Sequence, residues 1–135
     1  MSIAYRPTLP RPEAFRALFA TTGWDAGRPL TPERAAAALA GTRHAVAAYD
    51  GDRLVGFGRV IGDGVLHALL ADVIVDPAYQ RAGIGSEIVG RLVEHCRQEA
   101  VMDVQLFCAR GKRPFYERLG FLARDDEAPG MELGV

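Results

Sequence analysis

Four stretches of the chain carry the spacing, capping or stop signals of a helix. The strongest runs from Gly83 to about Ala100, where apolar residues recur every fourth position, at Ile84, Ile88, Leu92 and Cys96. Two shorter stretches begin at Pro12 and Pro32, because proline suits the first helical turn, and Thr31 is placed to cap the second. A short fourth helix is predicted over Lys112–Arg118, followed by Gly120 as a stop.

Between and after these helices, the pattern is typical of strands. Asp50-Gly51-Asp52 separates two apolar, partly β-branched runs, which predicts a hairpin. The run Val65–Val75 is apolar almost throughout and ends before Pro77, as expected for a central strand covered on both faces. The predicted strands are Ser2–Arg6, Ala45–Tyr49, Leu54–Ile61, Val65–Val75, Val101–Cys108, Phe121–Ala123 and Met131–Leu133.

The order of these elements predicts an α/β fold of the mixed, α+β kind. A strand, a long helix and a further strand follow one another from Val65 to Cys108, which indicates a βαβ crossover between parallel neighbours. The remaining strands are expected to pair mostly antiparallel, with helices flanking the sheet. No repeat, low-complexity tract or linker interrupts the chain, so residues 1–135 are interpreted as one domain.

Composition narrows the function. The 135 residues are 49% apolar and 24% charged with a net charge of −1 and no basic cluster, which argues against a nucleic-acid partner. No apolar run is long enough to span a bilayer and no signal peptide is evident, so no membrane association and a cytoplasmic location are expected. Cys96 and Cys108 lie far apart in the sequence, favour a reducing compartment and form no metal pattern, so no metal is expected.

The segment Gln80–Gly85 stands between the predicted central strand and the long helix. A helix start offers unpaired N–H groups and the positive end of the helix dipole, and glycines let a ligand approach the backbone. This placement indicates a phosphate site, although any tight turn between strand and helix can use glycines. The sequence has neither a P-loop nor a third glycine in Rossmann register.

The block from Asp72 to Gly85 resembles the acetyl-coenzyme A site of the GNAT family of N-acetyltransferases. That family has a strand, a turn with proline, and Gln/Arg-x-x-Gly-x-Gly/Ala at the start of a long helix. A second segment, Phe115–Phe121, is similar to the family's Phe/Leu-Tyr-x-x-x-Gly-Phe pattern. The spacing of the two segments and the order of elements agree over almost the whole chain. From Asp72 onward the sequence is most similar to small bacterial and plastid amine acetyltransferases of the serotonin-acetyltransferase type.

The resemblance implies a GNAT fold and acetyl-coenzyme A (acetyl-CoA) as co-substrate. It places the pyrophosphate on the backbone N–H groups of Arg81–Ser86, with Gln80 and Arg81 as further polar contacts; Arg81 is equally well explained as a solvated surface charge. It also pairs the pantetheine arm with the backbone of the preceding strand, whose side chains are expected to be core residues. The implied cofactor-binding residues are Val73, Ile74, Val75, Gln80, Arg81, Ala82, Gly83, Ile84, Gly85 and Ser86.

The same resemblance makes Tyr116 the candidate acid that protonates the leaving thiolate, because a phenol with a pKa near ~10 stays protonated at neutral pH. An acceptor amine must lose a proton before it attacks, and Asp72 and His67 are the candidates to accept that proton or to bind the amine. Asp72 could instead be a hydrogen-bonded structural carboxylate, and His67 a strand-end histidine. Cys108 lacks the basic partner that thiol catalysis requires.

One position departs from the family pattern. Many relatives carry an asparagine seven residues before the tyrosine, where this chain has Ala109, followed by the basic group Arg110–Arg113. That group is interpreted either as a replacement contact for the cofactor phosphates or as a solvated helix start. The turn-rich segment Trp24–Pro32 is a candidate lid on the acceptor side.

The resulting interpretation is an acetyl-CoA-dependent N-acetyltransferase acting by direct transfer on a primary amine. A small amine is favoured as acceptor, and a peptide or protein amine stays open. The alternative is a non-catalytic acyl-CoA-binding sensor or interaction module, which would have no need of Tyr116. A homodimer is compatible with either interpretation.

Overall fold

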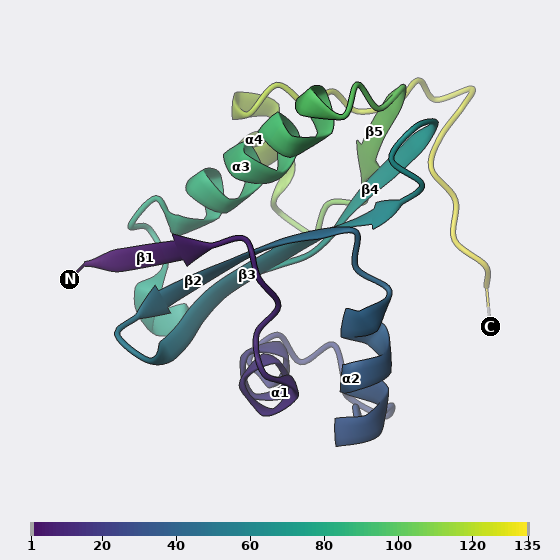
Figure 1. Cartoon of the computed structure of the whole chain (residues 1–135). Helices are drawn as coiled ribbons and strands as arrows, with labels where there is room; N and C mark the ends of the chain where they lie inside the picture. The colour runs from purple at the N-terminus through teal and green to yellow at the C-terminus, as the bar shows by residue number, and fades with distance from the viewer. Residues whose placement is uncertain (1, 135) are drawn as a thin grey trace.

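The computed structural model describes residues 2–134 and contains one five-stranded sheet with helices on both faces (Figure 1). The elements, in chain order, are β1 (Ile3–Arg6), α1 (Pro12–Ala20), α2 (Pro32–Ala40), β2 (His44–Asp50), β3 (Arg53–Gly62), β4 (His67–Val75), the 3₁₀ turn η1 (Pro77–Tyr79), α3 (Ile84–Gln98), β5 (Asp103–Leu106) and α4 (Arg113–Arg118).

The strands lie in the sheet in their sequence order, β1-β2-β3-β4-β5. The first three pairings are antiparallel, and the last, between β4 and β5, is parallel. The hairpin predicted at Asp50–Asp52 joins β2 and β3, and α3 provides the crossover between the parallel strands. Both the mixed, mostly antiparallel sheet and its parallel βαβ step are therefore confirmed.

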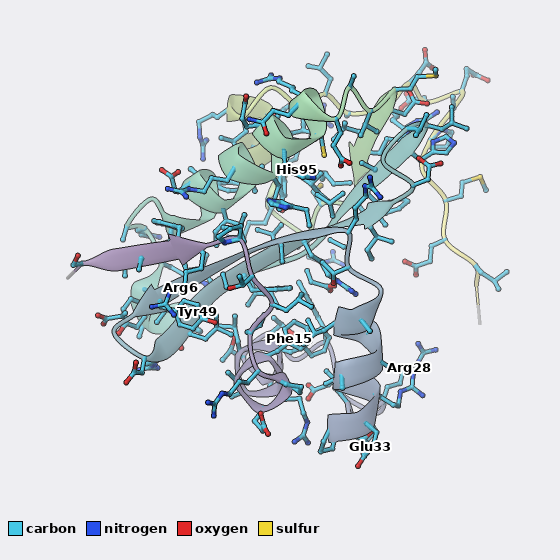
Figure 2. The ribbon with its side chains drawn as sticks, in the orientation of Figure 1. Arg6, Phe15, Arg28, Glu33, Tyr49 and His95 are labelled. Atoms are coloured by element: carbon cyan, nitrogen blue, oxygen red, sulfur yellow. The ribbon has the colours of Figure 1, made fainter. Side chains whose placement is uncertain are left out.

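Two buried clusters hold the layers together, one on each face of the sheet. The face under α3 buries the stripe Ile84, Ile88, Leu92 and Cys96, which confirms the predicted helix. The opposite face buries Phe15, whose ring lies 5.1 Å edge-on from that of Phe57 in β3 and fixes α1 against the sheet (Figure 2). The Thr31 hydroxyl accepts from the N–H of Arg34 at 3.2 Å, so the predicted cap of α2 is also confirmed.

The last part of the chain differs from the prediction. Residues 121–123 and 131–133 were expected to form short strands, but neither does; the chain runs past β4 and β5 and ends apart from the other elements (Figure 1). Both are too short to hold a strand conformation without a partner strand, and neither pairs with any strand of residues 2–134. Strand β4 begins at His67 rather than Val65, because the Asp63 carboxylate accepts from the N–H groups of residues 65–67 and turns the chain there. Strand β5 is likewise shorter than Val101–Cys108.

No helix in residues 2–134 combines the length and apolarity needed to cross a lipid bilayer.

Candidate functional site

A cleft of about 640 Å³ opens where β4 ends and α3 begins. Its walls come from four parts of the chain: the end of β4, the loop into α3, the segment around α4, and the turn that follows α1. The residues that matter for its chemistry are Thr22, Trp24, Val73, Ile74, Val75, Tyr79, Gln80, Arg81, Gly83, Ile84, Gly85, Ser86, Ala109, Lys112, Tyr116 and Arg118. Of the ten residues predicted to bind the cofactor, only Ala82 does not line the cleft.

The loop before α3 presents unpaired backbone donors to the cleft. Arg81 and Gly83 both have left-handed backbone angles, with φ of 65° and 81°, and the helix begins directly afterwards at Ile84. The first bond of the helix runs from the Glu87 N–H to the Gly83 carbonyl at 3.1 Å. The N–H groups of residues 84–86 precede that bond and so lack acceptors within the helix. Together with the helix dipole, they form a site suited to a phosphate group.

Gly85 allows α4 to lie close to this loop. A Cβ atom there would stand 3.3 Å from the ring of Phe115, closer than most Cβ contacts, and 3.6 Å from Val75, an ordinary van der Waals contact. The absence of a side chain therefore brings the segment that carries Tyr116 against the start of α3. The two segments that the sequence singled out separately form one wall.

A bulge in β4 opens the edge of the sheet beside this wall. Phe57 pairs with Ile74 and Arg59 with Ala71, so a single residue of β3 faces both Asp72 and Val73. Asp72 takes a left-handed angle, φ 54°, which is uncommon outside glycine. The pairing with β5 ends at Leu70, just before the bulge, and β4 continues for five residues with no strand from residues 2–134 on that side.

The main chain of this open stretch faces the cleft. The Asp76 N–H donates to the Val55 carbonyl of β3 at 2.8 Å, so the Val75 carbonyl of the same trans peptide points away from β3. The Gln80 side-chain amide donates to that carbonyl at 3.3 Å. Ile74 is buried on the α1 face, while Val73 and Val75 pack towards α3, so their side chains belong to the core as predicted. Such an edge can accept an extended ligand as an added strand.

Tyr116 is carried by α4 and lines the cleft beside the loop. Its ring packs edge-on against Phe115 and Phe121, with centroid separations of 4.9 and 6.0 Å. Burial raises the pKa of the Tyr116 phenol above its ordinary value, and the nearby Cys108 thiol adds to the rise. The hydroxyl therefore remains protonated throughout the neutral range and can act as a proton donor.

Asp72 is held by an ion pair. Its carboxylate accepts from the Arg59 guanidinium at 2.7 Å, and Arg59 also donates to the Ala38 carbonyl and the Thr42 hydroxyl at 2.6 and 3.2 Å. The two side chains are only 21% and 12% exposed, and Asp72 does not line the cleft. This arrangement links the bulge to the end of α2, so a structural role for Asp72 has direct geometric support.

The histidines lie away from the cleft. His67 occupies the first residue of β4, whereas the cleft is at the last, and its ring is exposed and 3.9 Å from Asp103. His44 and His95 stack on each other with ring centroids 3.7 Å apart, between β2 and α3 (His95 is labelled in Figure 2). The sequence put His67 on the strand that leads into the loop, β4, which lies second from the edge of the sheet rather than at its centre, and did not indicate which end of that strand holds the site.

The cleft is basic. Arg81, Lys112 and Arg118 line it, and among the described residues that line it there is no aspartate or glutamate. Lys112 comes from the basic group predicted as a possible phosphate contact. Ala109, the position that departs from the family pattern, also lines the cleft.

Thr22 and Arg118 line the cleft but were not predicted from the sequence. They reach it only through the packing of α1 and α4, which no local sequence pattern indicates. No cluster of metal-ligating side chains occurs in residues 2–134.

Comparison with known structures supports the same fold over the whole chain. A probable acetyltransferase of unknown function from methicillin-resistant Staphylococcus aureus superposes with a TM-score of 0.86 and 29% identity, covering 99% of this chain and 100% of that one. A GNAT-family acetyltransferase from Streptococcus pneumoniae gives a TM-score of 0.79 and 27% identity, covering 99% and 96%.

Curated relatives match over 79 residues, or 58% of this chain. A chloroplastic GCN5-related N-acetyltransferase of Arabidopsis thaliana is 37% identical and a chloroplastic serotonin N-acetyltransferase of rice (Oryza sativa subsp. japonica) is 38% identical. The match spans only 40% of the length of each of these proteins. The model of the GNAT acetyltransferase family matches residues 11–121, from the start of α1 to beyond the Tyr116 segment, and the chain therefore belongs to that family.

Proposed function

We propose that this protein is an N-acetyltransferase that transfers the acetyl group of acetyl-CoA directly to a primary amine. The observation that carries the proposal is the cleft itself. It joins a helix start with unpaired N–H groups, an open strand edge and a protonated tyrosine hydroxyl in a single cavity. Each of these matches a different part of the donor: the pyrophosphate, the pantetheine arm and the thiol.

The donor would lie along two elements. The pyrophosphate fits the N–H groups of residues 84–86, and the pantetheine amides fit the exposed main chain of Val73–Val75. The Gln80 amide would have to release the Val75 carbonyl for this pairing to extend to the end of β4. Ala109 stands where many relatives carry an asparagine that contacts the cofactor. Lys112 and Arg118 would compensate for the loss of that contact by supplying positive charge to the phosphates.

The transfer needs one nucleophile and one acid. The lone pair of the neutral amine forms a bond to the acetyl carbonyl carbon, and the carbon–sulfur bond then breaks with its electrons on sulfur. The Tyr116 hydroxyl donates its proton to that thiolate and becomes a phenolate. The amine nitrogen releases a proton to solvent, and solvent then reprotonates the phenolate. The amide and the free thiol of coenzyme A are the products, and the transfer is redox-neutral, so no oxidant is consumed.

A small amine is the acceptor that the cleft supports best. Trp24 is 50% exposed and packs edge-on against Phe19, with ring centroids 5.8 Å apart, so it offers an aromatic wall. Such a wall can contact a flat or cationic small molecule. The relatives carry names with both kinds of acceptor, serotonin for the rice protein and histone for a soybean (Glycine max) protein, so a protein amine is the competing class.

An amine panel tests the activity. Purified protein is incubated with acetyl-CoA and, separately, arylalkylamines, polyamines, amino sugars and a lysine peptide, and release of free coenzyme A thiol is followed. We expect turnover with at least one small amine. Binding of acetyl-CoA without turnover on any amine would favour the non-catalytic sensor, the alternative consistent with the same cleft.

The role of Asp72 is tested by changing it to asparagine. Asparagine tolerates the left-handed angle and can still accept from Arg59, but it cannot accept a proton. If the carboxylate braces the bulge, we expect kcat/KM to change by no more than about threefold, under 1 kcal/mol, and the acidic limb of the pH profile to remain. A fall of about 100-fold or more with loss of that limb would instead assign Asp72 as the general base.

A further inference from the structure

The bulge in β4 decides which main-chain groups reach the cleft. Leu70 packs in the buried cluster under α3, and the next residues of β4 that pack there are Val73 and Val75. Leu70 and Val73 are three positions apart in the sequence, whereas the side chains of a regular strand return to the same face every second residue. The bulge at Asp72 therefore inserts one residue and shifts the alternation.

A regular strand at this point would reverse the pattern that follows it. Ile74, which is buried in the cluster on the opposite face, would turn towards α3, and the two valines would turn away from it. The main-chain groups would exchange sides as well, because those of successive residues point to opposite edges of a strand. The Val75 carbonyl would then point at β3 instead of the cleft. The pairing that the open edge offers to an extended ligand thus depends on the bulge.

Arg59, on the neighbouring strand β3, holds the bulge in place. The left-handed angle of Asp72 is unfavourable for a residue other than glycine and needs an anchor. The Arg59 Nε donates to the Asp72 carboxylate at 2.7 Å. The Arg59 Nη1 donates to the Ala38 carbonyl at 2.6 Å and to the Thr42 hydroxyl at 3.2 Å. The Ala38 carbonyl lies at the end of α2, where the helix dipole favours a cation, so one guanidinium joins the bulge to that helix end.

The ion pair acts on the cleft without being part of it. Neither Arg59 nor Asp72 lines the cleft, whereas Val73 and Val75, which follow the bulge, do. We propose that Arg59 is a positioning residue for the donor: by holding the bulge, it keeps the main chain of Val73–Val75 in the register that pairs with the pantetheine arm. The identity of the donor rests on the proposed function.

Arg59→Met tests the proposal, because methionine keeps an unbranched apolar side chain and removes the charge and the donors. We expect the dissociation constant for coenzyme A, measured by titration calorimetry, to rise about tenfold. The nucleotide half of coenzyme A, which is ADP carrying the ribose phosphate, lacks the pantetheine arm. Its dissociation constant should stay within about twofold of the wild-type value. A merely structural role for Arg59 would weaken the binding of both ligands alike.

A second substitution separates the bulge from the ion pair. Glycine adopts the left-handed angle without strain, so Arg59→Met/Asp72→Gly should recover the wild-type affinity for coenzyme A. Arg59→Met/Asp72→Ala is its matched partner. Both double variants avoid the unpaired carboxylate that Arg59→Met leaves behind, but alanine is strained at this angle. The alanine variant should therefore bind coenzyme A as weakly as Arg59→Met, and it replaces that variant if the single change prevents folding.

Arg43→Met is the control, because Arg43 also pairs with a carboxylate, that of Glu99 at the end of α3, and does not line the cleft. Its dissociation constant for coenzyme A should be that of the wild type. Equal affinities of the alanine and glycine double variants would overturn the proposal. So would wild-type affinity in a folded Arg59→Met protein, or an equal loss for coenzyme A and its nucleotide half.

The same titrations distinguish this proposal from the proposed activity. A wild-type protein that binds no coenzyme A would overturn the donor and the positioning role together. Binding of coenzyme A with the expected pattern among the variants, but without acetyl transfer to any amine, would contradict the activity alone and leave the role of Arg59 supported.

Discussion

Changing Gly83 to leucine is expected to raise the dissociation constant for coenzyme A by about 100-fold, or about 2.7 kcal/mol. Two effects lead to this value. A leucine side chain at a position that lines the cleft would fill the space in front of the N–H groups of residues 84–86. The loss of one hydrogen bond to a charged phosphate, at roughly 1.5–3 kcal/mol, accounts for a change of this size. Titration calorimetry with coenzyme A measures it.

Gly51→Leu separates this effect from backbone strain. Gly51 and Gly83 both have left-handed angles, φ 61° and 81°, and an added Cβ would meet no atom within 4 Å at either position. Leucine should therefore lower the stability of the two variants by similar amounts, on the order of 1–2 kcal/mol. Only Gly83 lines the cleft, so Gly51→Leu should bind coenzyme A as the wild type does. Equal affinities for both variants would remove the phosphate site from this loop.

Much of the fold follows from local patterns. The four-residue stripe from Ile84 to Cys96 specified α3, Asp50-Gly51-Asp52 specified the hairpin, and Thr31-Pro32 specified the start of α2. These elements are confirmed because their side chains and backbone angles satisfy local and tertiary requirements together. The loop from Gln80 to Ser86 was located for the same reason, since its position between strand and helix can be read from its neighbours.

The geometry of the site depends on contacts between distant residues and was less predictable. Asp72 stood out in an apolar run, but neither its left-handed angle nor the resulting bulge can be read from that run. The left-handed angle and the bulge occur together with an ion pair to Arg59, whose guanidinium also donates to the Ala38 carbonyl at the end of α2. Trp24 and Arg118 reach the cleft only after α1 and α4 have packed. The strands expected after residue 120 were wrong because a short apolar run needs a partner strand, and none of the strands in the described part of the chain lies beside either run.

Tyr116→Phe is expected to lower kcat by about 100- to 10,000-fold, the range for loss of a positioned general acid. The change removes one oxygen atom. Because the packing against Phe115 and Phe121 involves the ring and not the hydroxyl, the melting temperature and the affinity for coenzyme A should stay unchanged. Steady-state kinetics on the best amine of the panel, together with calorimetry, measures the three quantities.

Tyr79→Phe supplies the comparison, since Tyr79 lines the same cleft but its hydroxyl donates to the Asp50 carboxylate. This variant should lose some stability and retain turnover, which is the reverse of the pattern expected for Tyr116. The pH profile gives a further check. Because burial raises the pKa of Tyr116, wild-type turnover should fall only above the ordinary range of tyrosine, where the phenol loses its proton. Undiminished turnover in Tyr116→Phe, with that alkaline limb still present, would show that another group or water protonates the thiolate.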